Sequence, residues 1–327
     1  PKFTIYGTTE PIDFNLEDAY KKGVMVGKGG FGEVHKALFG FSGIQEVAIK
    51  FVKNEPLVLK EFDVLTKFSP MNVGPKFYGC QYTSRSIMIA QTLLYKDLSK
   101  DSTMLRLKKV PNSQFLERIR DVVDSLRTMW DNNYVHMDIK EHNIMTNKDF
   151  SKFYLIDFGL AQRKDHYMAS AGTPFYFSPT KWTSRYSRPQ PKDDLYSVAL
   201  TIGILEAVSG FDELVQYELP NGLISVLPNS CFHIRLTSDC QQVLKTNVRR
   251  ILRKSNYGEY HRSPKLRQKD TINFTTLVAL MINYADYPFD YDQTVDILDR
   301  LITEFKILEG AGVTKTKQKT SDFTDPE

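Results

Sequence analysis

The chain has few cysteines and no long apolar run, and these absences exclude several classes of protein. Its three cysteines, Cys80, Cys231 and Cys240, form no CxxC pair, so neither a disulfide framework nor a zinc site is indicated. No apolar run reaches the roughly 18 residues that a membrane span needs, and the first residues lack the apolar core of a signal peptide. We therefore expect an intracellular protein, cytoplasmic or nuclear, or one in the host cytoplasm if the chain comes from a pathogen.

Net charge is also small, at +4 for 327 residues, but one segment is strongly basic. Residues 245–269 contain nine Lys or Arg and a single acid, Glu259. Such a block can be a solvated loop, which is the common fate of like charges. It can also be a docking surface for an acidic protein or a nucleic acid, because clustered cations attract phosphates. The sequence leaves both interpretations open and does not indicate an oligomeric state.

Apolar residues make up 41% of the chain and charged residues 25%, an ordinary balance for a globular protein with a real core. The length fits about two domains, or two lobes of one chain. Short apolar or β-branched runs at residues 24–26, 34–38, 47–52 and 87–90 predict strands separated by glycine-bearing turns. A helix is expected to begin near Pro56, because proline is tolerated in the first helical turn.

From about residue 97 the apolar spacing becomes helical. Apolar positions in residues 115–130 recur every three or four residues, which predicts an amphipathic helix. Residues 198–208 are apolar on all sides, as in a buried helix, and residues 274–284 and 295–305 give two further helical patterns. The expected organisation is an N-terminal extension (1–18), a small β-rich lobe (19–94), a larger helical lobe that carries the basic segment (95–308) and a disordered tail (309–327), with a cleft near residues 92–97.

Residues with recognisable chemistry are concentrated in the string HMDIKEHN at 136–143 and in Asp157-Phe-Gly, fourteen residues later. Asp138 supplies an acid near a candidate acceptor site, and Lys140 supplies a cation. Asn143 and Asp157 supply oxygen ligands suited to Mg²⁺, which prefers a few protein oxygens together with substrate phosphates. The string therefore indicates half of a phosphoryl-transfer site.

The N-terminal third supplies the other half. Residues 27–32, GKGGFG, fit the pattern G-x-G-x-x-G, which is a weak signal alone, and the strand-like residues around them predict a strand–loop–strand hairpin. Glycines in that hairpin let the backbone approach phosphates where side chains would clash. Residues 47–50, Val-Ala-Ile-Lys, place Lys50 in a buried strand, where a cation is costly unless it is paired, here with Glu61 and nucleotide phosphates. The alternative is a lysine that reaches the surface, which would be preferred if the strand stood alone.

Together these motifs resemble those of the eukaryotic-type protein kinase superfamily, over about residues 24–305. Their order is glycine-rich loop, Val-Ala-Ile-Lys, helix glutamate, catalytic loop, Asp-Phe-Gly, then GTPFYFSPT at 172–180 and Asp194-Leu-Tyr-Ser. The resemblance implies the bilobal protein kinase fold, which is α+β, with a small antiparallel sheet lobe that has one main helix and a larger, mostly helical lobe. It also implies ATP and Mg²⁺ as cofactors and a protein as substrate.

The resemblance assigns a role to each matching residue. Lys50 would hold the α- and β-phosphates and pair with Glu61. Asp138 would orient the substrate hydroxyl and accept its proton, while Lys140 would steady the transferring phosphoryl group. Two further residues would bind the metal, and a larger set would bind the nucleotide. The metal ligands would be Asn143 and Asp157, and the nucleotide set would be Gly27, Gly29, Gly30, Phe31, Gly32, Val34, Ala48, Lys50, Gln91 as gatekeeper and Leu93.

Two positions resemble the serine/threonine class of these enzymes more than the tyrosine class. Lys140 follows the catalytic aspartate by two, and Thr173, a further candidate catalytic residue, lies in the Gly-Thr-Pro segment. Met137, however, replaces the arginine that usually pairs with a phosphorylated activation loop. We therefore predict activity without that phosphorylation, although Ser170 and Tyr167 remain candidate modification sites.

Other departures concern subfamily and substrate. Thr180 stands where the family has the glutamate of Ala-Pro-Glu, which casein kinases also lack, and the form His-x-Asp-Ile-Lys-x-x-Asn resembles casein kinases and vaccinia-related kinases. His142 occupies the position of an acid that binds substrate arginine in many kinases, so a preference for basic substrates is not supported. The spacing from Lys50 to Glu61 is shorter than usual and implies a short connection into the helix.

Several conspicuous residues are expected to pack rather than to react. His136 should pack behind the loop, Phe158 should lie beneath the helix of Glu61, and Asp194 should bind the main chain of the catalytic loop. Trp130 and Trp182 are expected in the core or an interface. Two alternatives to an active protein kinase remain: a nucleotide-binding pseudokinase or scaffold, and a small-molecule kinase on the same fold.

Overall fold

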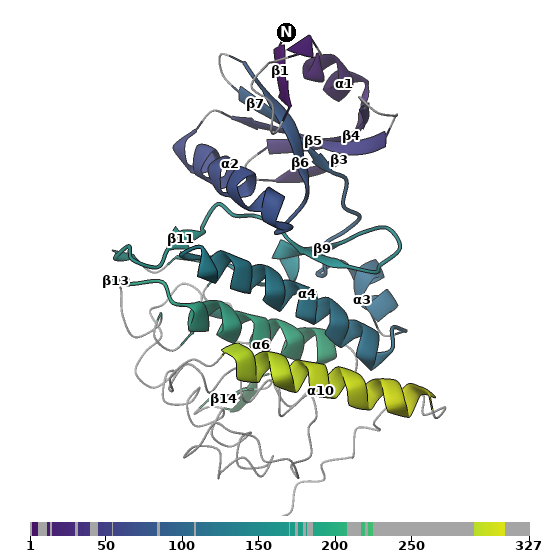
Figure 1. Cartoon of the computed structure of the whole chain (residues 1–327), viewed down its shortest axis with the longest axis vertical. Coiled ribbons are helices and arrows are strands. Elements are labelled where there is room, and N and C mark those ends of the chain that lie inside the picture. The colour runs from purple at the N-terminus through teal and green to yellow at the C-terminus, as the bar shows by residue number, and fades with distance from the viewer. Residues whose placement is uncertain are drawn as a thin grey trace, which may run out of the picture.

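A seven-stranded antiparallel sheet forms the small N-terminal lobe of the computed structural model (Figure 1). The strand order is β2-β1-β6-β7-β5-β4-β3. The strands are β1 (Lys2–Ile5), β2 (Ile12–Asp13), β3 (Val24–Gly29), β4 (Gly32–Phe39), β5 (Gln45–Lys53), β6 (Phe77–Tyr82) and β7 (Ser86–Thr92).

The structure describes residues 2–5, 12–13, 15–29, 32–39, 45–53, 55–83, 86–107, 109–169, 171–173, 176–178, 181, 186–207, 217–219, 222–224 and 291–310. Several features predicted from the sequence lie outside these residues. They are Gly30, Phe31, Ser170, Thr180, Trp182, the basic segment 245–269, the helix expected at 274–284 and the tail after residue 310.

The four strands predicted from β-branched runs are present. Residues 24–26, 34–38, 47–52 and 87–90 lie within β3, β4, β5 and β7. The sequence pattern missed β6, whose pairing with β7 shifts register just before Gly79. Such an irregularity interrupts the alternation by which strands are identified.

The described parts of the predicted N-terminal extension, residues 1–18, pack on the small lobe. Strand β1 pairs with β6, and α1 (Leu16–Lys22) packs on β4. The helix begins where it does because the Asn15 side chain accepts hydrogen bonds from two N–H groups of the first turn. The N–H of Leu16 donates to Oε1 of Gln81 at 2.8 Å, which ties the start of α1 to β6.

The two faces of the sheet pack against different partners. On the outer face, α1 and the sheet share a small core of Leu16, Ala37, Val47, Ile49, Met88 and Ala90. On the inner face, Val52 and its β7 neighbours join a larger cluster that continues into the C-terminal lobe. Because residues directly opposite on neighbouring strands share a face, the pairs Val34–Lys50 and Ala48–Gln91 lie on the inner face.

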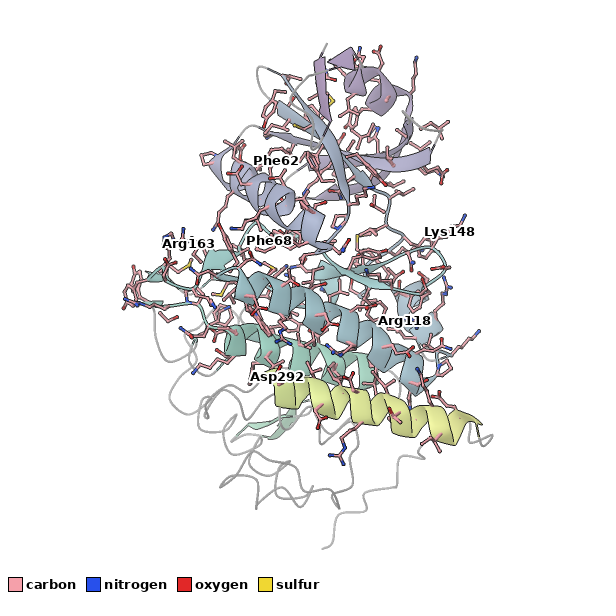
Figure 2. All side chains as sticks on the ribbon, viewed as in Figure 1. Phe62, Phe68, Arg118, Lys148, Arg163 and Asp292 are labelled. Carbon is pink, nitrogen blue, oxygen red and sulfur yellow. The ribbon has the colours of Figure 1, made fainter. Side chains whose placement is uncertain are left out.

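Helix α2 (Pro56–Phe68) contacts both lobes. It begins at the predicted proline, whose missing N–H costs nothing in the first turn. Phe62 packs edge-on against a ring of β6, and Phe68 packs edge-on against a ring of β8 (Tyr134–Val135). Figure 2 shows Phe62 on the side of the helix toward the sheet and Phe68 at its end toward the lower lobe.

Helix α4 (Asn112–Asp131) is the central element of the C-terminal lobe. The apolar stripe predicted over residues 115–130 is buried along it. It packs against α6 (Pro191–Ala207) and α10 (Tyr291–Gly310), which lie beneath it in Figure 1. Among the described helices, none combines the length and the apolarity needed to cross a membrane.

Helices α6 and α10 contain two of the other predicted helical segments. Helix α6 begins at Pro191, ahead of the predicted segment 198–208, and the described side chains within that segment are buried, namely Val198, Ala199, Thr201 and Ile202. Helix α10 contains the predicted segment 295–305 and continues to Gly310, past the boundary expected at residue 308.

Short elements surround the junction of the lobes. Residues 92–97 connect the lobes and are hydrogen-bonded to β9, since the N–H of Tyr95 donates to the Thr146 carbonyl at 2.7 Å. Strand β9 therefore lies directly below the connection. The other short elements are η1 (Ser69–Met71), α3 (Asp101–Leu107), η2 (Glu141–Asn143), β9 (Ile144–Thr146), β10 (Phe153–Leu155), β11 (Gln162–Arg163), β12 (Met168–Ala169) and β13 (Tyr186–Ser187). Strands β14 (Tyr217–Leu219) and β15 (Gly222–Ile224) form a separate antiparallel pair, and Figure 1 shows β14 low in the larger lobe, away from the junction.

Candidate active site

Asp194 of α6 fixes the backbone of the catalytic loop. Its carboxylate accepts hydrogen bonds from the main-chain N–H groups of His136 (2.8 Å) and Met137 (2.9 Å) and from the indole N–H of Trp130 (3.0 Å). Met137 has a φ of 74°, an uncommon conformation for a non-glycine residue, and these bonds hold it there. The predicted role of Asp194 as an anchor and the core position of Trp130 are confirmed.

His136 packs behind the loop, as predicted, and Phe158 packs against it. His136 is fully buried, and its ring meets that of Phe158 edge-on at 5.4 Å between centroids. Its Nε2 lies 3.1 Å from the carbonyl oxygen of Ile156. The Asp-Phe-Gly segment is thereby attached to the catalytic loop through packing and a hydrogen bond.

Asp138 is held at the centre of the site by four contacts. One carboxylate oxygen accepts from the N–H (2.9 Å) and the hydroxyl (2.8 Å) of Thr173, and the other accepts from the Asn143 amide (2.9 Å) and lies 3.3 Å from the Lys140 ammonium. Burial raises the pKa of Asp138, but the Thr173 hydrogen bond and the Lys140 charge together outweigh burial and hold it below the ordinary value. The carboxylate is therefore ionised at neutral pH.

Thr173 links the two charged groups of the catalytic loop. The ammonium of Lys140 donates to its hydroxyl oxygen at 2.6 Å, while the same hydroxyl donates to Asp138. Three of the predicted catalytic residues, Asp138, Lys140 and Thr173, thus form one hydrogen-bonded cluster. A hydroxyl at position 173 makes both bonds because it can donate to the Asp138 carboxylate and accept from the Lys140 ammonium at once.

Asn143 and Asp157, the predicted metal ligands, come from neighbouring segments. The N–H of Ile156 donates to the Asn143 carbonyl at 3.0 Å, which places the residue before Asp157 against Asn143. Both side-chain hydrogen bonds of Asn143 use its amide nitrogen, which leaves its side-chain oxygen for a cation. In the part of the chain that the structure describes, no group of three or more His, Cys, Asp or Glu side chains is arranged to hold a metal ion by itself. Two oxygen ligands beside a phosphate site suit Mg²⁺, which keeps water and substrate oxygens as its other ligands.

The ion pair predicted between Lys50 and Glu61 is present. The ammonium of Lys50, on β5, lies 2.6 Å from the Glu61 carboxylate on α2. The two side chains are only 21% and 12% exposed, so this lysine is not one that reaches the surface. The pair joins the inner face of the sheet to α2, the helix that contacts both lobes.

Four of the residues predicted to hold the nucleotide lie on the inner face of the sheet. Val34, Ala48 and Gln91 share this face with Lys50. Among the described residues, the atom nearest to a Cβ built at Gly27 is the Cβ of Val34 at 4.0 Å, so none of them requires glycine there. Close approach of a ligand would require it, which fits a nucleotide site.

The connection between the lobes offers main-chain groups to a ligand. Within the described segments, no hydrogen bond engages the main chain of Leu93 or Leu94. Sequence reasoning missed Met145, which lies on β9 next to Asp97 and points to the opposite side from its two buried strand neighbours. The apolar alternation after Asn143 was the signal that could have identified Met145 as a candidate contact for the adenine ring of a bound nucleotide.

A buried contact between the catalytic loop and residue 176 was also missed. The hydroxyl of Tyr176 donates to the carboxylate of Glu141, and both residues are buried. Burial, with the nearby Glu141 charge adding to it, raises the pKa of Tyr176 well above its ordinary value, so the phenol stays protonated and donates. Nothing in the linear pattern connects two residues so far apart.

Comparison with known proteins agrees with this geometry. The family model described as "Protein kinase domain" matches residues 20–216, more than half of the chain. The chain is 29% identical over 163 residues to the serine/threonine-protein kinase cst-1 of Caenorhabditis briggsae, which covers 47% of this chain and 32% of that protein. It is 26% identical over 200 residues to MAP3K epsilon protein kinase 1 of Arabidopsis thaliana, covering 57% of this chain and 14% of that protein.

A third relative has a mixed specificity in its name. The membrane-associated tyrosine- and threonine-specific cdc2-inhibitory kinase of Drosophila melanogaster is 25% identical over 249 residues, covering 72% of this chain and 44% of that protein. The chain therefore spans less than half the length of each of these relatives. The resemblance to casein kinases and vaccinia-related kinases stays a prediction.

Proposed function

Because the chain belongs to the protein kinase family, we propose that it transfers a phosphoryl group from ATP to serine or threonine hydroxyls of proteins. The observation that carries the proposal is the cluster of Asp138, Lys140 and Thr173, in which an ionised carboxylate and a cation are hydrogen-bonded through one hydroxyl. This arrangement has an acceptor for the proton of the attacking hydroxyl and a charge to stabilise the transferring group.

The residues divide the chemistry among themselves. The Asp138 carboxylate orients the substrate hydroxyl and takes its proton, which its low pKa permits only as the oxygen–phosphorus bond forms. Lys140 steadies the transferring phosphoryl group, and Lys50, held by Glu61, binds the phosphates that stay behind. Asn143 and Asp157 would hold Mg²⁺, which supplies neutralisation of phosphate charge. Most of the rate enhancement then comes from positioning and charge.

Preference for serine and threonine is supported by Lys140 and Thr173. The Lys140 ammonium and the Thr173 hydroxyl lie 2.6 Å apart beside Asp138. Both residue types at these positions resemble the serine/threonine class. The printed name of the Caenorhabditis briggsae relative agrees with that class, whereas the Drosophila melanogaster name includes tyrosine. Phosphoamino-acid analysis of a phosphorylated substrate decides between them.

The test of the proposal compares the wild-type chain with Asp138→Asn. We expect purified protein with Mg-ATP to phosphorylate a generic protein such as casein, and the variant to lose about a hundredfold or more of the rate while it still binds ATP. Nucleotide binding without transfer by the wild-type protein would indicate a pseudokinase or scaffold. Transfer to small-molecule acceptors but to no protein would indicate a small-molecule kinase.

We further propose that activity does not depend on phosphorylation of the activation loop. Met137 has no charge with which to pair a phosphate, and its backbone is already fixed by Asp194. Tyr167 is 68% exposed and accessible to modification. Protein treated with phosphatase, and shown by intact mass to be unmodified, should keep its turnover; loss of turnover would contradict this point.

A further inference from the structure

A buried lysine joins the catalytic loop to the segment that carries Thr173. Lys181 is 4% exposed. Its ammonium donates to the main-chain carbonyl of Met137 at 3.0 Å and to that of Ala171 at 2.9 Å. It also lies 4.7 Å from the ring centroid of Phe177. One cation therefore holds a residue of the catalytic loop and a residue two positions before Thr173.

The charges around Lys181 match a cation. Asp138, Asp193 and Asp194 are each at most 7% exposed and act electrostatically on this ammonium. Burial lowers the pKa of Lys181, and the three carboxylates oppose that effect. A buried ammonium is costly unless it is both hydrogen-bonded and offset by opposite charge, and here it has both.

Gly172 shows how closely the two segments approach. A Cβ on this residue would lie 2.5 Å from the Met137 carbonyl oxygen and 3.4 Å from the Lys181 ammonium, and its φ of +119° disfavours any side chain. The carbonyl that accepts from Lys181 is therefore the same one against which the Gly172 backbone rests. Thr173, the next residue, then donates twice to Asp138.

We propose that Lys181 is a positioning residue that holds the segment 171–173 on the catalytic loop, in the place of a phosphorylated activation loop. The inference rests on the proposed kinase function and deepens it. In kinases whose catalytic loop carries arginine, a phosphate on the activation loop orders this region through that arginine. Here the cation is Lys181, which follows the segment 171–173 in the chain and binds main-chain carbonyls, so no added phosphate is required. Lys181 acts through Thr173 and Asp138 and touches neither nucleotide nor acceptor.

The test uses phosphatase-treated full chain with Lys181→Met, which removes the charge and both donors at similar volume. We expect the rate constant kcat to fall about tenfold or more, as for the loss of hydrogen bonds to a charged group, while the Kd of an ATP analogue stays unchanged. Amide hydrogen exchange at residues 171–173 should become faster, with exchange in α4 unaffected. Lys148→Met is the matched control, because this exposed lysine lies in the turn between β9 and β10 at the edge of the lobe (Figure 2).

Each outcome decides the inference. Unchanged kcat and unchanged exchange at residues 171–173 in Lys181→Met overturn it. If the wild-type chain transfers no phosphate at all, the kinase proposal fails separately, and the exchange comparison still tests the tether. If Lys181→Met does not fold, Lys181→Gln, which keeps one donating group without charge, is measured in the same way. Equality of that variant with wild type in both readouts overturns the inference.

Discussion

At the scale of single residues, the site depends on how one carboxylate is surrounded. Asp138 is buried, which by itself would favour protonation, yet its pKa is held low by Thr173 and Lys140. The hydroxyl of Thr173 is the contact that can be removed with least change in volume. It therefore offers a direct test of what keeps the acid ionised.

We predict that Thr173→Val raises the pKa of Asp138 and shifts the acid limb of the kcat/KM profile to higher pH. The pKa rises because the lost hydrogen bond stabilised the charged form of Asp138. The lowered pKa of Asp138 also stabilises the folded state, and this contribution is lost as the pH falls through that pKa. Thr173→Ser, which keeps the hydroxyl, should leave the acid limb in place. A profile for Thr173→Val that overlies the wild type would show that the Thr173 hydroxyl is not what lowers this pKa.

Another prediction at this scale compares two Lys–Glu pairs whose lysines lie in the same sheet. Glu61→Gln removes the partner of Lys50, and we expect kcat/KM for ATP to fall about tenfold to a hundredfold, because a partly buried charge loses its counter-ion. The matched control is Glu46→Gln. Its pair with Lys36 has a similar length, 2.5 Å, but both side chains are more than 40% exposed.

Exposed pairs contribute little, at most about 1 kcal/mol, so Glu46→Gln should leave steady-state kinetics unchanged. Equal losses in both variants would mean that the sheet responds to any change of charge. The role assigned to Glu61 would then be unsupported.

At the scale of elements, the loop after η1 supports the Asp-Phe-Gly segment. Gly74 has a φ of +75°, and a Cβ there would lie 2.9 Å from the Phe158 ring and 3.1 Å from the Leu155 carbonyl oxygen. We predict that Gly74→Ala displaces Phe158 and, with it, Asp157, so that the Mg²⁺ concentration for half-maximal activity rises several-fold. Gly310→Ala, at a position where a Cβ meets no atom within 4 Å, is the matched control and should be silent. Unchanged Mg²⁺ dependence in Gly74→Ala would show that Phe158 can shift without moving its neighbour.

Elements with regular apolar spacing were predictable from the sequence, and contacts between distant segments were not. Helix α4 and the four β-branched strands follow from periodicity, because burial of one face requires it. Strand β1 gave no such signal, since two short strands at a sheet edge depend on a partner, β6, whose own pattern is irregular. The Lys50–Glu61 pair was predicted because a family pattern linked the two positions.

Lys181 shows why part of the site could not be predicted. Its neighbours in sequence give no periodic pattern, and a lysine is on average exposed. Its partners, Met137 and Ala171, are main-chain carbonyls, which any residue type would supply. A contact made by backbone groups leaves no mark in the residue types of its acceptors, so only the folded geometry identifies it.

At the scale of the whole molecule, the two hydrophobic clusters differ in how closely they are connected to the active site. The large cluster runs from Val52 of the sheet through Phe158 to Ile302 of α10, so it joins both lobes and includes the segment that carries Asp157. The small cluster around Leu16 lies on the opposite face of the sheet from Lys50. A substitution in the small cluster should therefore affect nucleotide binding less than a substitution in the large cluster.

We predict that Leu16→Ala, a change at a fully buried position of the small cluster, lowers the free energy of unfolding by about 2–5 kcal/mol. At 10 °C, where the variant is still folded, the Kd of an ATP analogue should stay within about twofold of wild type, because distant sites act independently. Leu116→Ala, equally buried but in the large cluster, is the comparison. It should also increase the rate of amide hydrogen exchange in β9 and β10. If Leu16→Ala weakened nucleotide binding in proportion to its loss of stability, the sheet would transmit strain between its faces. The N-terminal helix would then act on the active site as well as on the fold.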